Sequence, residues 1–385
     1  MIAKLNDCLQ AGRQIDGHGS GLSRHQLDVY RQHQISTDHE ATTIQQIQER
    51  INEGFYVFLR EGTVERDLEN TVGAVNESNA SRFAFCTDDK LVDSLLNEGG
   101  INDCIRKAIQ HSLRPETAYT MASFNAAQAH QTPFIGDYQA DIVVLDDPYD
   151  VKIHQVIKKG HLISNHDFNT HPLSFAKNTM NFALSPADLQ LPLNSTTANI
   201  IQVIPNHIET EHLVEPVSIH NGNFCPDPSN DQLKMVVVER HHHTGKIGKA
   251  IVKGFNLTHG AVASSIAHDS HNIIAVGTND ADLFAAIQHL QKVGGGITVF
   301  ANHHELATLP LQIGGLMSNL SYKETAQKLN AITAAYQSIS RPIAFNPFIT
   351  LSFLALPVIP TLKLTARGLY NFDQQKFIPI EASIN

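Results

Sequence analysis

The 385-residue sequence lacks several features that would assign it to a familiar class of protein. Its only cysteines are Cys8, Cys86, Cys104 and Cys225, and no C-x-x-C pair occurs. This scatter indicates reduced thiols and argues against a disulfide framework or a zinc site built on thiolates. No stretch approaches the roughly 18 apolar residues of a membrane helix, and no apolar signal core follows the start. We therefore expect a cytoplasmic protein without a membrane segment.

Basic clusters and several catalytic motifs are also missing. The formal net charge is −10 at pH 7 and no dense Lys/Arg block occurs, which argues against a nucleic-acid partner but leaves a free base or nucleoside open. The H-x-E and P-C-x-x-C pair of the cytidine-deaminase zinc site is absent. So are the G-x-S-x-G elbow and the Walker phosphate loop, which excludes those routes to hydrolysis.

Strand and helix patterns alternate four times in the first hundred residues. Expected strands cover residues 15–18, 34–40, 55–61 and 82–89, and apolar residues at helical spacing follow each of them. Successive βα units imply parallel strands with right-handed crossovers, and four such units predict half of a (β/α)₈ barrel. In that barrel, side chains at the carboxyl ends of the strands line the catalytic face.

The periodicity later changes from helical to alternating. Residues 136–146 and 152–160 predict two antiparallel strands of a small β unit, and the remaining half mixes strand and helix patterns. The sequence therefore predicts an α/β chain in three parts. These are a partial (β/α) TIM-type barrel over residues 1–132, a small β unit over 133–165 and a C-terminal α+β domain over 166–385.

Histidines and carboxylates fall at the ends of the expected barrel strands. His18, His39 and Asp88 combine the imidazole and carboxylate ligands that suit zinc, manganese or iron. A metal held there would lower the pKa of a bound water, and a carboxylate such as Asp88 could relay the proton. Because the chain has 22 histidines, the alternative is that these two are simply packed or solvated.

Two further groups of polar residues could contact a substrate. Arg60 and Glu61, at the end of the third expected strand, either orient a substrate or form a salt bridge at the barrel rim. Residues 267–272, with His268, Asp269 and His271, are either a functional loop or a surface turn. Cys86 is expected to be a buried core thiol and not a nucleophile, because no base lies beside it in the sequence.

Several short motifs, taken in order, resemble adenine deaminase of the amidohydrolase superfamily. They are Asp16-Gly17-His18 with Gly21-Leu22-Ser23, Asp38-His39-Glu40, Arg60-Glu61-Gly62, Cys86-Thr87-Asp88-Asp89, and residues 140–146, 237–241, 267–273 and 351–360. The resemblance runs from about residue 14 to the C-terminus. It implies hydrolysis of adenine to hypoxanthine and ammonia by metal-activated hydroxide at a two-metal site, usually with manganese or iron.

The same resemblance implies roles for individual residues. His18 and His39 resemble the ligands of one metal, and Asp88 resembles the ligand and proton shuttle at the other. Asp88 and Glu40 are then the expected catalytic carboxylates. Candidate substrate contacts are Arg60, Glu61, His268, Asp269 and His271.

One part of the family pattern has no counterpart in this sequence. The family's barrel opens with an H-x-H pair and a later strand supplies a glutamate that bridges the metals, but neither precedes Asp16. A half-barrel would expose strand edges and keep about half of its metal ligands. Three interpretations follow: a deaminase whose N-terminal fragment is separate, a truncated inactive remnant, or a binding or assembly module. The expected partners are adenine and either a missing N-terminal fragment or further copies of the chain.

Overall fold

The computed structural model describes residues 2–130, 140–164 and 180–382. These residues form two compact units, Met1–Pro172 and Leu173–Asn385, and each unit is described by itself below. The predicted boundaries between residues 132 and 133 and between 165 and 166 lie outside the described residues. The division into three parts therefore stays a prediction.

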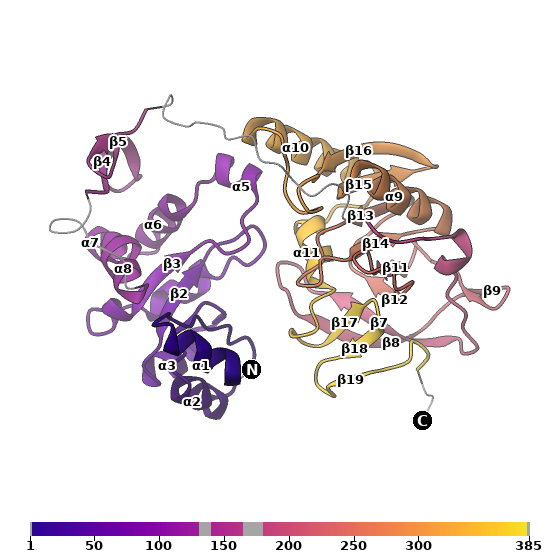
Figure 1. The fold of residues 1–385 in the computed structure, drawn as a ribbon, viewed down its shortest axis with the longest axis horizontal. Coiled ribbons are helices and arrows are strands. Elements are labelled where there is room, and N and C mark those ends of the chain that lie inside the picture. Colours follow the sequence, from indigo (N-terminus) through magenta and orange to yellow (C-terminus); the bar gives the residue numbers. More distant parts are fainter. Residues whose placement is uncertain (1, 131–139, 165–179, 383–385) are drawn as a thin grey trace. The chain divides into compact units, whose positions relative to one another are not determined.

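The first unit is built on a three-stranded parallel sheet. Strands β1 (Thr37–Asp38), β2 (Tyr56–Arg60) and β3 (Phe83–Cys86) are neighbours in that order, and Figure 1 labels β2 and β3. The helices of this unit are α1 (Ile2–Gln10), α2 (Arg24–Gln32), α3 (Ile44–Asn52), α4 (Leu68–Thr71), α5 (Val92–Asn97), α6 (Ile101–Gln110), α7 (Pro115–Thr120) and α8 (Ala126–Ala129), with 3-10 turns at Val72–Ala74 and Ala80–Arg82 and a π-helical turn at Met121–Asn125. Apolar side chains of β2, β3, α3 and α6 form its main core.

The expected strand at residues 15–18 is absent from the described structure, so only three of the four predicted barrel strands form. The segment runs beside β1, but its amides bond side chains instead of a backbone ladder. Gly17 N donates to Thr37 Oγ1 at 3.3 Å, and Gly19 N donates to Asp38 Oδ1 at 2.6 Å. Strands were correctly predicted within residues 55–61 and 82–89, while the strand within 34–40 shrinks to two residues. The parallel α/β character is confirmed, but the partial barrel is not.

The predicted small β unit is present as an antiparallel sheet of three strands. Strand β5 (Lys152–Lys158) pairs with β4 (Ile142–Asp147) and with β6 (His161–Leu162). Tyr119 Oη donates to Pro148 O at 2.6 Å, and Val151 joins the main core of the first unit. The described strands of this sheet are therefore anchored to α7 by both a hydrogen bond and apolar packing.

An eight-stranded sheet forms the centre of the second unit, in the order β16-β15-β13-β14-β11-β12-β7-β8 (Figure 1). All its pairings are antiparallel except β12 with β7. The strands are β7 (Thr197–Val203), β8 (Thr210–Pro216), β11 (Leu233–Val238), β12 (Ile247–Lys253), β13 (Ala261–Ser264), β14 (Ile273–Gly277), β15 (Gly296–Ala301) and β16 (His304–Pro310). Every residue of β11, β13 and β14 is buried, as expected for strands covered on both faces.

Helices and two smaller sheets complete the second unit. They are α9 (Asp280–Val293), α10 (Tyr322–Ile339), α11 (Pro347–Phe353), a 3-10 turn at Pro186–Leu189, the pair β9 (Ile219–His220) and β10 (Asn223–Phe224), and the sheet of β17 (Leu362–Thr365), β18 (Gly368–Asn371) and β19 (Lys376–Phe377). The N-cap of α9 is Asn279, whose side chain accepts from Asp282 N, and Gly294 ends the helix at φ 85°. The α+β character of this half is confirmed.

Among the helices of the described ranges, none combines the length and the apolar character needed to cross a bilayer.

Lys363 of β17 provides a test of the second unit's packing. The residue is fully buried, its Nζ donates to Ile208 O at 2.5 Å, and burial lowers its pKa to about 7 against a weaker raising effect of Glu209. Because the unfolded chain then holds more protons between pH 7 and 10.5, stability should rise with pH in that window. From pH 7 to pH 9 the wild type should gain about 2 kcal/mol in unfolding free energy relative to Lys363→Met. Urea unfolding at each pH measures this gain, and parallel pH profiles would contradict it.

Candidate metal centre

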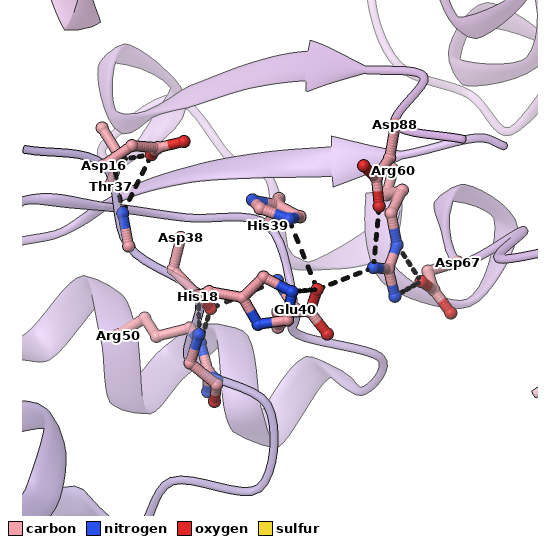
Figure 2. A network of polar contacts seen from close by, with 12 residues as sticks. Asp16, His18, Thr37, Asp38, His39, Glu40, Arg50, Arg60, Asp67 and Asp88 are labelled. Atoms are coloured by element: carbon pink, nitrogen blue, oxygen red, sulfur yellow. Dashed lines mark hydrogen bonds and ion pairs between the residues drawn. The ribbon is translucent and has the colours of Figure 1, made fainter. Parts of the chain in front are cut away.

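Two histidines and a glutamate converge at the carboxyl end of β1. Glu40 Oε1 lies 3.2 Å from His18 Nε2 and 3.3 Å from His39 Nε2 (Figure 2). The two imidazole rings meet edge to face, with centroids 5.3 Å apart. The His18 side chain is 52% exposed while Glu40 is almost fully buried, so the cluster opens to solvent on the His18 side.

The loop that carries His18 is fastened to β1 at two points. Asp16 Oδ1 accepts a hydrogen bond from Thr37 Oγ1, and Asp38 Oδ1 accepts one from Gly19 N. Glycine is needed on either side of His18, because a Cβ at Gly17 would clash with the carbonyl oxygen of Thr37 and one at Gly19 would lie 2.8 Å from Asp38 Oδ1. The close approach of these two backbones places His18 beside His39.

Arg60, the last residue of β2, is buried and joins three carboxylates. Its Nη1 donates to Glu40 Oε1 at 2.9 Å and to Asp88 Oδ2 at 3.3 Å. Its Nε and Nη2 donate to Asp67 Oδ2 at 3.0 and 2.9 Å, as Figure 2 shows. Arg60 therefore links Glu40, which follows β1, to Asp88, which follows β3.

The local charges set the protonation of the cluster. Burial favours a higher pKa for Glu40, but the His39 hydrogen bond and the Arg60 charge outweigh it and lower the pKa to about 2. Burial opposes protonation of His39, yet its hydrogen bond to Glu40 raises its pKa. Glu40 is thus a carboxylate at neutral pH and attracts positive charge.

The donor set of this cluster fits a divalent metal. One ligand atom from each of His18, His39 and Glu40 can be chosen so that all three lie within 4.8 Å of one another. Two imidazole nitrogens and a carboxylate oxygen are ligands that zinc, manganese and iron accept. The predicted third ligand, Asp88, lies outside this group and meets it through Arg60. The structure thus brings together a possible His/Glu metal-binding group.

Glu61 lies in a different environment from its neighbour Arg60. It belongs to a closed ring of six alternating charges, which runs Glu61, Lys107, Asp103, Lys90, Glu98, Arg66 and back to Glu61, with closest N···O distances of 2.6, 3.0, 3.3, 3.1, 2.7 and 3.6 Å. The Glu61 side chain is 4% exposed. These contacts favour the salt-bridge alternative over substrate contact for Glu61.

The remaining predicted residues lie in the β13–β14 loop of the second unit. The His268 ring stacks on Phe353 with centroids 4.5 Å apart, and its backbone N donates to Ser352 O at 3.1 Å. Arg240 Nε donates to the carbonyl oxygen of His271 at 2.5 Å, while the side chain of Asp269 is 82% exposed. The loop is therefore held at both ends and presents a carboxylate to solvent.

Sequence patterns did not point to three buried charged residues around the centre. Arg50 lies on the helix α3, and Asp67 and Glu65 lie between β2 and α4. A single charged residue in such a position is usually solvated, so only the fold reveals the burial. The one available signal was the density of charge in Arg60-Glu61 and Glu65-Arg66-Asp67.

Two family descriptions match the sequence. "Adenine deaminase C-terminal domain" matches residues 207–376, and "Amidohydrolase family" matches residues 1–163. Among solved structures, N-acetyl-D-glucosamine-6-phosphate deacetylase from Mycobacterium smegmatis aligns at a TM-score of 0.31 and 16% identity, over 43% of this chain and 59% of that one. A likeness at that level carries no argument about this chain.

Curated relatives match over essentially the whole chain. Adenine deaminase of Lactiplantibacillus plantarum is 50% identical over 100% of this chain and 69% of its own length. Adenine deaminase of Listeria innocua is 46% identical over 100% of this chain and 68% of its own. Adenine deaminase of Geobacillus kaustophilus is 45% identical over 99% of this chain and 68% of its own.

Glu65 yields a prediction about pH. Neither carboxylate oxygen bonds another residue within the described ranges, and burial raises its pKa to about 7. Arg60 and the backbone amide of Glu65 itself oppose the shift, while Asp89 and Asp88 reinforce it. Because the folded chain then holds more protons between pH 4.5 and 7, this contribution to stability is present at low pH and lost as the pH rises. From pH 5 to pH 7 the wild type should lose about 2 kcal/mol relative to Glu65→Gln. Chemical unfolding at both pH values measures the loss, and an equal change in the two proteins would exclude it.

Proposed function

Because this chain belongs to the adenine deaminase family, we propose that it hydrolyses adenine to hypoxanthine and ammonia with a divalent metal held at His18 and His39. The observation that carries this proposal is the approach of both imidazole Nε2 atoms to the same oxygen of Glu40. The identity to adenine deaminases extends over the whole chain and does not favour an inactive remnant.

The metal would be manganese, iron or zinc, and a complete centre would hold two ions. When bound, such an ion lowers the pKa of a water molecule and supplies hydroxide at neutral pH. His18 and His39 are the proposed ligands of one ion, and Asp88 of the other. Glu40 keeps a negative charge beside both histidines, which favours a cation there.

The reaction requires proton transfer as well as a nucleophile. Water adds to the ring carbon that bears the amine, so one proton must leave the water and reach the departing nitrogen. Asp88 suits this step because its side chain is 34% exposed and Arg60 Nη1 contacts one of its oxygens at 3.3 Å. Glu40, with a pKa of about 2, can accept hydrogen bonds at neutral pH but does not store a proton.

Substrate contacts remain proposals. The guanidinium of Arg60 already pairs with three carboxylates, so we propose that its role is to orient Asp88 and Glu40. His268, Asp269 and His271 are the proposed contacts from the second unit. A stacked imidazole and an exposed carboxylate suit a flat, nitrogen-rich base.

The expected partner of the chain stays a prediction. It is further copies of this chain. Light scattering after size exclusion distinguishes a monomer from an oligomer. A monomer at all protein concentrations would show that this prediction is wrong.

Activity of metal-loaded variants tests the proposed centre. His18→Ala removes a ligand and Asp88→Ala removes the proton relay, so each should lower adenine turnover at least about 100-fold. The readout is ammonia release after loading with Mn²⁺, together with a count of metal per chain. His25→Ala is the matched control, because His25 is exposed on α2, and it should leave turnover unchanged. Normal turnover in His18→Ala or Asp88→Ala would refute the assignment.

A further inference from the structure

Arg50 occupies an unusual position for a charged residue of a short helix. It lies in the last turn of α3 and only 1% of it is exposed. Its Nε contacts Asp38 Oδ2, its Nη2 donates to Gly19 O at 2.7 Å, and its Nη1 donates to Gln46 O at 3.1 Å. All three nitrogens of this guanidinium are therefore engaged.

The partners of Arg50 lie next to the two histidines of the metal centre. Gly19 directly follows His18, and Asp38 directly precedes His39. Asp38 uses its other oxygen to accept from Gly19 N at 2.6 Å, so Asp38, Arg50 and Gly19 close a cycle of hydrogen bonds. We call this cycle the Asp38–Arg50 clasp.

We propose that Arg50 is a positioning residue, which acts through the clasp to hold His18 and His39 at the spacing that a divalent cation needs. The inference rests on the proposed function, since it assumes a cation at those histidines. Arg50 itself is not placed in contact with substrate or metal.

The geometry favours this role over general support of the fold. His18 belongs to a loop without regular structure and its side chain is half exposed, so its own packing does not fix its position. The loop is held instead by the Asp16–Thr37 contact before His18, by the Tyr30 hydroxyl, which donates to His18 O at 3.3 Å, and by the clasp after it. Loosening the clasp would free the loop that carries His18, while His39 keeps its place directly after β1.

Mn²⁺ titration of the full chain, followed by calorimetry, tests the proposal. In Arg50→Lys a single ammonium cannot reproduce the planar fork that reaches both Asp38 and Gly19. We expect about 10- to 100-fold weaker Mn²⁺ binding, the usual effect of losing a residue that orients a metal ligand. In the adenine assay the Mn²⁺ concentration for half activation should rise by the same factor, with kcat at saturating Mn²⁺ within about twofold of the wild type.

Ile47→Val is the matched control. Ile47 lies one turn earlier on α3 and is buried in the core, so the substitution removes a buried methyl group without changing a residue of the clasp. It should lower stability while Mn²⁺ affinity stays within twofold. If Arg50→Lys does not fold, Asp38→Asn replaces it, because the amide keeps an acceptor for Gly19 N and loses the charge that Arg50 holds.

The possible outcomes test the positioning role of Arg50 and the proposed function separately. Mn²⁺ binding that depends on His18 but is unchanged in Arg50→Lys overturns the positioning role alone. An equal loss of affinity in Ile47→Val also overturns it, since stability would then explain the effect. Absence of any His18-dependent Mn²⁺ binding in the wild type overturns the proposed function and the positioning role together.

Discussion

A single buried guanidinium holds the candidate centre together. Arg60 at the end of β2 donates to Glu40 after β1 and to Asp88 after β3. Its other two nitrogens donate to Asp67, which fixes the orientation of the guanidinium. Adjacent parallel strands bring their carboxyl ends to one edge but leave the side chains there free to splay. The guanidinium draws these acidic side chains together, and the position of Glu40 in turn sets where the two imidazoles meet.

Charge balance around Arg60 connects the fold to a metal. When Glu40, Asp67 and Asp88 are ionised, three negative charges surround one positive charge. Burying unbalanced charge is costly, and proteins relieve the cost by protonation or by binding a cation. Glu65 shows the first response, because burial raises its pKa to about 7. The solvent-open histidine pair offers a place for the second, since a divalent ion would add positive charge beside the Glu40 carboxylate.

The sequence pointed to residues that cluster in the structure but not to their geometry. His18 and His39 were identified because each follows an expected strand and precedes a helical pattern. The same reasoning predicted a strand at 15–18, which was wrong: side-chain acceptors on β1 take up the amides of Gly17 and Gly19, so no ladder forms. Sequence spacing also could not show that Glu40, and not Asp88, lies against both histidines. Arg60 Nη1 donates to both carboxylates, so only the fold distinguishes them.

The ring of six alternating charges that includes Glu61 affects how the first unit responds to heating. The hydration of charged groups becomes less favourable as temperature rises, so withdrawing them from water costs less. In a closed ring each side chain pairs with two partners. The conformational entropy lost by ordering one side chain is therefore offset by two ion pairs instead of one. The contribution of the ring to the first unit therefore grows on warming, and the end of β2 next to the metal centre should be among the last parts of that unit to loosen.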